Sequence, residues 1–232
     1  MTGIRVRRAG RLGLVLFAMV AFGLFMLPWF RGDGGEGTTN GLDLVYVEPA
    51  LPGTPNPLTQ YFLELAPLPA YVGLLLAFTV AVRRRWAWIV AVVVVVLAAV
   101  LTAASAAGLL AGVEDYWEPA EVARYRLFAL VTAALAVVLL AAAGTLAVGL
   151  RHVYHGFVVA LLLAFTAFHL VNVAILAGQA VGQRMTLTAW LPAPAYLLAA
   201  GCAVLAATGA ALAERSEPAA TPAPVGQPAV RA

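Results

Sequence analysis

The sequence predicts an all-α integral membrane protein, a bundle of six transmembrane helices with both termini in the cytoplasm. Its 232 residues are 63% hydrophobic and only 11% charged, whereas soluble domains average about 25% charged residues. Several apolar runs also approach the roughly 20 residues that a helix needs to cross the hydrocarbon core of a bilayer. Because water would not tolerate so apolar a surface, the bilayer is the expected solvent. All fourteen cations are arginine, which with the Ala, Val and Gly content suggests a GC-rich bacterial genome, so a bacterial plasma membrane is the expected location.

Six apolar runs are the expected spans. The first follows four arginines, as a secretory signal would, but it is too long for a typical signal core and no A-x-A cleavage site follows it, so we expect it to remain as a span. The second is the shortest, and the prolines at its entrance suit a first helical turn. The six runs cover residues 12–30, 68–82, 86–112, 120–150, 156–178 and 191–213.

Arginine gathers on alternate connections, and this sets the expected orientation. Ten of the fourteen cations fall on one side when the N-terminus is placed in the cytoplasm, among them the triplet at residues 83–85. Cytoplasmic connections are enriched in basic residues. Nine of the eleven acidic residues fall on the opposite side. Both termini are therefore predicted to be cytoplasmic.

The parts outside the spans differ in composition. Residues 1–11 form a basic cytoplasmic N-terminus ahead of the transmembrane domain at 12–213, and the Pro- and Ala-rich residues 214–232 are predicted to be a disordered cytoplasmic tail. The external loop at 31–67 is expected to be a partly ordered surface. The alternative is a small β-element around residues 42–47 that caps the bundle.

A second external connection, residues 112–126, carries aromatic side chains expected at the headgroup level, Trp117 and Tyr125. Glu121 and Arg124 stand at i, i+3 and predict a modest surface ion pair. Glu64 is the acidic residue nearest to a span and is expected at the external mouth of the second one. Apart from Glu121, in the first turn of the fourth run, no Asp or Glu lies within a predicted span, so ion-coupled transport loses its usual carboxylate at membrane depth.

All three histidines lie between residues 152 and 172. His152 and His155 follow Arg151 in a short connection and are expected at the membrane interface. His169 lies deep in the fifth run, where it shares a helix face with Thr166 and Asn172, so the three are expected to hydrogen-bond within the bundle. They would otherwise line a polar path for a solute or ion.

His155 and His169 also stand fourteen residues apart, which places them on one helix face about 21 Å apart along the axis. This spacing resembles one helix of the cytochrome b family, in which two such histidines each ligate a different haem. Two such haems need four ligands, so the resemblance implies haem binding only in a homodimer. No metal site is expected, because His152 and His155 have no evident third ligand. No cofactor is predicted otherwise.

Two GxxxG patterns predict helix contacts: Gly108 with Gly112, and Gly178 with Gly182. Small residues at this spacing let two membrane helices approach closely. We expect intrachain contacts here in preference to contacts between molecules. Catalytic motifs are lacking, and the single cysteine, Cys202, excludes an intrachain disulfide.

The stretch FMLPWFRGDGGEGTTNGLDL, at the end of the first run, resembles the opening of small, uncharacterised multipass membrane proteins of actinobacteria. The resemblance implies a plasma-membrane location and no activity. We therefore expect a non-enzymatic accessory or scaffold subunit that meets a membrane-protein partner, or a second copy, through its external loops. Alternatives are a small-solute channel or carrier with a path around His169 and Asn172, and a haem-binding protein. The lipid bilayer is an expected partner and nucleic acid is not.

Overall fold

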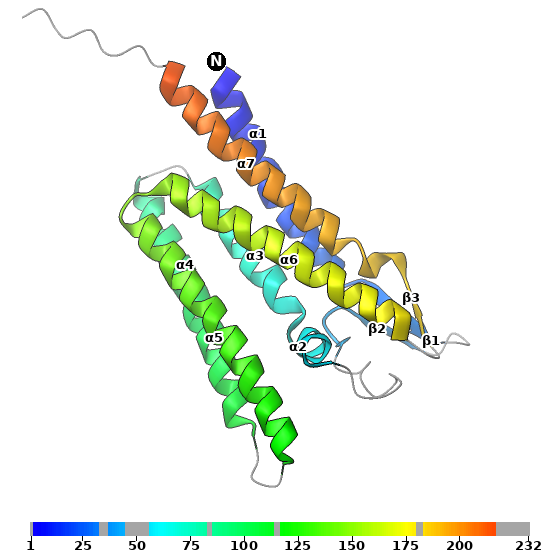
Figure 1. Cartoon of the computed structure of the whole chain (residues 1–232). Helices are drawn as coiled ribbons and strands as arrows, with labels where there is room; N and C mark the ends of the chain where they lie inside the picture. The colour runs from blue at the N-terminus through cyan, green and yellow to red at the C-terminus, as the bar shows by residue number, and fades with distance from the viewer. Residues whose placement is uncertain are drawn as a thin grey trace, which may run out of the picture.

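The computed structural model describes residues 2–32, 37–44, 56–82, 85–113, 117–179 and 183–216. It is a bundle of helices with a small sheet at one end (Figure 1). The helices are α1 (Thr2–Leu24), α2 (Pro57–Leu65), α3 (Pro67–Ala81), α4 (Arg85–Ala111), α5 (Pro119–Ala147), α6 (Arg151–Gln179), α7 (Pro192–Ser216) and the short 3-10 helix η2 (Leu187–Ala189). The strands are β1 (Pro28–Gly32), β2 (Thr38–Asn40) and β3 (Gln183–Met185).

Within the described residues, four helices are long and apolar enough to cross a membrane, which confirms the predicted class of helical membrane protein. They cover Ala87–Ala111, Pro119–Ala147, Arg151–Gln179 and Leu187–Leu212. The helices α2 and α3 meet at a 59° bend and would together form a fifth. Helix α1 is not among them, and its first half carries the four arginines of the N-terminus.

Several predicted boundaries are wrong. Helix α1 begins at Thr2 and ends at Leu24, because Trp29 donates from its indole Nε1 to the Leu24 carbonyl (2.9 Å) and Pro28 then starts β1. Helix α6 begins at Arg151, so the first two histidines lie in its opening turns and not in a loop. Helix α7 continues to Ser216, and the remainder of the predicted tail lies outside the described residues.

The end of the predicted external loop is helical and buried. Asn56 caps α2 by accepting a hydrogen bond from the Thr59 amide (3.0 Å), and Pro57 occupies the first helical position. Both residue types are favoured at these positions. Five consecutive residues of α2 are buried: Thr59, Gln60, Tyr61, Phe62 and Leu63. The expected surface loop thus contributes a packed helix to the bundle.

A small antiparallel sheet lies where α1 ends and α7 begins, in the strand order β2-β1-β3 (Figure 1). It pairs Phe30 with Met185 and Pro28 with Asn40. The Thr186 hydroxyl donates to the Pro28 carbonyl (2.6 Å), which ties together two segments far apart in the sequence. The predicted β-element is thus built from other residues: 42–44 lie outside the strands, and 45–47 lie outside the described residues.

Helices α1 and α7 lie side by side and antiparallel, in the closest helix contact of the described chain (Figure 1). A Cβ at Gly10 would lie 2.5 Å from the Ala206 main-chain nitrogen, and one at Gly209 would lie 2.4 Å from that of Arg7. Either separation is far inside van der Waals contact, so only glycine fits. Since lipid supplies no hydrophobic drive between helices, such close packing is what holds the pair together.

Candidate functional site

The most deeply buried histidine, His169, lies at the end of the bundle that carries the sheet. His169 is 2% exposed, and its Nε2 donates to the carbonyl of Ala189 in η2 (2.8 Å). Four aromatic rings surround the imidazole, with centroids 5.3 to 6.4 Å away, namely Phe25, Trp29, Phe62 and Tyr196. These rings come from the residue that follows α1, from β1, from α2 and from α7. His169 thus joins the elements that meet beneath the sheet.

The other two members of the predicted polar cluster bond to their own helix. Thr166 donates to the Leu162 carbonyl and Asn172 donates to the Phe168 carbonyl, both at 2.8 Å. Both are buried, as is His169. The three residues therefore share the buried side of α6, as predicted, but each donates to a main-chain carbonyl instead of to the others.

The pair of histidines considered for haem is divided between two environments. His155 lies at the start of α6, where its Nδ1 donates to the Arg151 carbonyl (2.5 Å). His169 is enclosed by rings at the far end of the same helix, with Nε2 committed to Ala189. Among the described residues, no group of three His, Cys, Asp or Glu side chains is placed to hold a metal ion.

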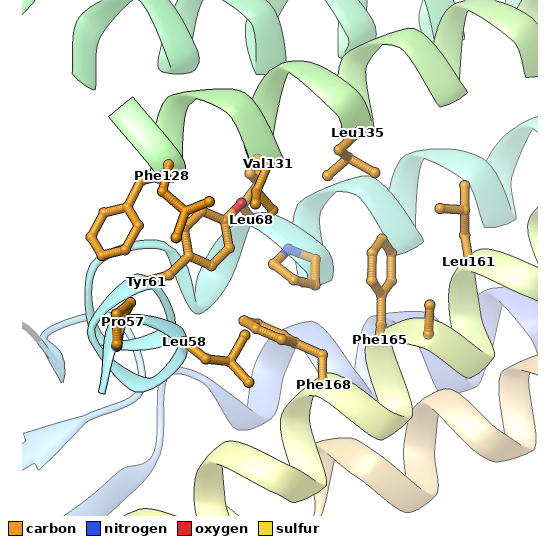
Figure 2. Close-up of a pocket in the computed structure, with 13 residues that line it drawn as sticks. Pro57, Leu58, Tyr61, Leu68, Phe128, Val131, Leu135, Leu161, Phe165 and Phe168 are labelled. Carbon is orange, nitrogen blue, oxygen red and sulfur yellow. The ribbon is translucent and has the colours of Figure 1, made fainter. Parts of the chain in front are cut away.

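An apolar pocket of about 310 Å³ lies between α2, α3, α5 and α6, where the hairpin of α4 and α5 diverges from α6 (Figures 1 and 2). Figure 2 shows the rings of Tyr61, Phe128, Phe165 and Phe168 around it. Its lining is Pro57, Leu58, Tyr61, Leu68, Pro69, Leu127, Phe128, Val131, Leu135, Leu161, Ala164, Phe165 and Phe168. Binding pockets for small apolar groups begin at roughly this volume, about 300 Å³, and are lined in this way.

Tyr61 contributes the one polar side chain of this lining, and its hydroxyl already has a hydrogen-bond partner. It lies 3.0 Å from the Thr132 hydroxyl, which in turn donates to the Phe128 carbonyl (2.8 Å). A ligand in the pocket would therefore meet hydrocarbon and aromatic surface without competing for an open hydrogen-bonding group. This arrangement suits an apolar chain or apolar side chains and offers no catalytic group.

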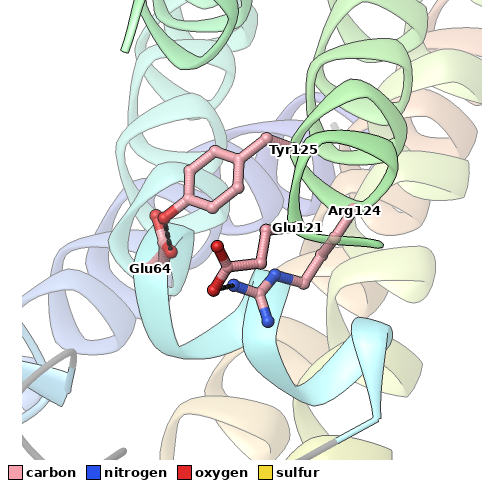
Figure 3. A network of polar contacts seen from close by, with 4 residues as sticks. All are labelled: Glu64, Glu121, Arg124 and Tyr125. Carbon is pink, nitrogen blue, oxygen red and sulfur yellow. Dashed lines mark hydrogen bonds and ion pairs between the residues drawn. The ribbon is translucent and has the colours of Figure 1, made fainter. Parts of the chain in front are cut away.

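A polar network lies at the start of α5 (Figure 3). The Tyr125 hydroxyl donates to Glu64 Oε1 (2.7 Å), which links α5 to α2. Arg124 pairs with Glu121 at 3.9 Å, which confirms the predicted ion pair, and its guanidinium carbon lies 5.6 Å from the centroid of the Tyr125 ring. The link from Glu64 to Tyr125 joins two walls of the apolar pocket and was not predicted, because the two residues are 61 positions apart.

The predicted intrachain use of the GxxxG patterns is wrong for the described glycines. A Cβ added to Gly108 or Gly178 would meet nothing within 4 Å, and one at Gly112 would meet only its own helix. Gly182 lies outside the described residues. Helix α4 instead turns another seam inward, made of Ala91, Val95, Ala98, Thr102 and Ala106, which repeats at three or four residues. The glycines are left on the outer surface of the described chain.

Comparison of the chain with protein-family models, curated proteins and solved structures gave no match. The resemblance of the first span to actinobacterial multipass proteins therefore stays a prediction. The functional argument rests on the chain's own geometry.

Proposed function

We propose that the chain crosses the bacterial plasma membrane six times, with both termini in the cytoplasm, and serves as a non-enzymatic accessory or scaffold subunit of a membrane assembly. The apolar pocket between α5 and α6 carries the proposal. It would receive apolar side chains from a partner's transmembrane helix, because it opens within the bundle wall and presents no free polar group.

The arrangement of the helices supports six crossings. The bent pair of α2 and α3 adds a fifth to the four long helices. Helix α1 adds a sixth, since it runs antiparallel to α7 in close contact. The starts of α1, α4 and α6, which carry arginines, then face one side, in keeping with the positive-inside rule (Figure 1).

The external loop predicted to meet a partner also contributes residues to this pocket. The loop at 31–67 was expected to meet a partner, and its helical end supplies Pro57, Leu58 and Tyr61 to the lining. A partner helix at the pocket would therefore touch both the membrane-embedded wall and the external segment.

The two alternative functions gain less support. A polar path would need Thr166, His169 and Asn172 to face a passage, whereas each is buried and donates to a main-chain carbonyl. Haem ligation would need His169 to give up the bond to Ala189 and part the four rings around it.

Purification from the native membrane in mild detergent tests the proposal. We expect a stable companion protein or a defined homo-oligomer by native mass spectrometry. Val131→Trp, which fills the pocket from α5, should release the companion. Val137→Trp, on the same helix but 65% exposed and outside the pocket lining, should retain it.

Three outcomes would contradict the proposal. The first is a wild-type protein that is a monomer without a companion under conditions that preserve other complexes. The second is that both tryptophan variants keep the companion equally well. The third is that the only mass released by Val131→Trp is that of a lipid.

A further inference from the structure

A second pocket, of about 270 Å³, lies at the opposite end of the molecule from the sheet. Its basic side chains are Arg11 from α1 and Arg151, His152 and His155 from the start of α6. Gly149 and four alanines of α7, Ala206, Ala207, Ala210 and Ala211, complete the lining. None of these nine residues is acidic, so the pocket gathers positive charge from two separate elements.

The same basic groups reach further into the bundle. Arg11, Arg151 and His155 also line a smaller cavity of about 30 Å³ that continues to Tyr154, Thr79 and Trp88. The polar groups at that inner end are engaged: the hydroxyls of Thr79 and Tyr154 are hydrogen-bonded to each other, and the Trp88 indole donates to the Leu146 carbonyl (2.9 Å). A ligand would therefore be held by the basic groups at the wider, outer cavity.

The geometry of the side chains suits an anion with several oxygens. The hydrogen bond from Nδ1 of His155 to the Arg151 carbonyl orients the ring, and the donors for an anion are the guanidinium groups of Arg151 and Arg11. Arginine presents a planar fork of donors that matches phosphate oxygens. The side chains that α7 contributes to the lining are all alanine methyl groups. Because they are short, they leave room for a tetrahedral group beside the basic residues.

We propose that this basic pocket binds a phosphate anion at the membrane surface. Two sources share this chemistry: the headgroup of an anionic phospholipid in the adjoining leaflet, and a soluble phosphate. The anion would lie between Arg11 and Arg151, and it would bridge α1 to α6. The proposal is independent of the accessory-subunit function, since its pocket shares no lining residue with the apolar one.

Binding is tested with the full chain, purified and delipidated in a neutral detergent. One arm adds phosphatidylglycerol or phosphatidylcholine and counts bound lipid by native mass spectrometry. The other arm titrates inorganic phosphate and follows the melting temperature by tryptophan fluorescence. The test variants are Arg151→Gln with His155→Gln, and Arg151→Lys, which keeps the charge. The matched control is Arg8→Gln, an exposed arginine of α1 outside this pocket.

The wild type should bind one phosphatidylglycerol in preference to phosphatidylcholine, or show a melting temperature that rises with inorganic phosphate. The first result identifies a lipid headgroup, and the second a soluble phosphate. The double variant should bind at least about tenfold more weakly, Arg151→Lys should fall between, and Arg8→Gln should match the wild type.

The proposal is overturned if neither probe binds the wild type, or if the double variant binds as tightly as the wild type. It is also overturned if Arg8→Gln weakens binding as much as the double variant, since the effect would then be one of general surface charge. Melting temperatures of all variants without ligand show whether each is folded. If the double variant is not folded, the comparison of Arg151→Lys with the wild type still tests the proposal.

Discussion

His169 shows how a single buried polar residue can be structural inside a membrane protein. A polar group facing lipid is costly, so such residues turn inward and find partners. The sequence indicated the inward direction from its depth in an apolar run. It could not indicate the partner, because Ala189 lies 20 residues away in the turn before α7, where no periodicity guides prediction.

Replacing His169 with alanine should destabilise the fold. The variant loses the bond to Ala189 and leaves a cavity among four rings, and we expect a loss of about 2–4 kcal/mol of unfolding free energy. Thermal unfolding in detergent, followed by tryptophan fluorescence, measures it. Leu170→Ala, at an outward-facing neighbour on α6, should change stability by less than about 0.5 kcal/mol. Equal melting temperatures for the two variants would contradict the packing role of His169.

At the scale of the helices, hydropathy predicted the bounds of α3 and α4 to within one residue, whereas α1 and α6 begin ten and five residues before the predicted runs. The GxxxG patterns failed because small residues on one helix predict a contact only if a complementary face exists on another. On α4 the buried residues from Ala91 to Ala106 form the face that packs in the bundle, and Gly108 therefore faces outward. The glycines that do permit contact are Gly10, in the predicted basic N-terminus, and Gly209, within the predicted sixth run, and neither belongs to a GxxxG pattern.

Leucine at the two kinds of glycine should therefore act in opposite directions. Gly10→Leu forces a side chain into the α7 backbone, and overpacking of this kind costs about 1–3 kcal/mol or more. Gly108→Leu meets open space and gains up to about 1 kcal/mol of helix propensity. Melting temperatures of the two variants should fall on either side of the wild type. A Gly10→Leu variant as stable as the wild type would contradict the close packing of α1 on α7.

At the scale of the whole molecule, α1 alone is too short to cross the bilayer in the proposed six-span topology. Its residues after Arg11 extend only about 20 Å along a helix, against about 30 Å of hydrocarbon. The remainder is supplied by β1, whose Trp29 and Phe30 are buried. Irregular backbone at membrane depth is tolerated where protein covers it, and in this topology the sheet and the residues that lead into α7 would provide the cover. The sequence placed one straight helix over the whole run because hydropathy does not register this change from helix to strand.

Labelling of single cysteines decides whether this composite first span crosses the membrane. In a Cys202→Ala background, Ile4→Cys places an exposed thiol near the start of α1 and Thr38→Cys places one on β2. If α1 and β1 cross together, an impermeant maleimide should label Thr38→Cys in intact cells and Ile4→Cys only after permeabilisation. If α1 instead lay along the membrane surface, both thiols would be labelled under the same condition, because no crossing would separate them. The paired result therefore separates six crossings from five, and it does so at residues that no proposed site uses.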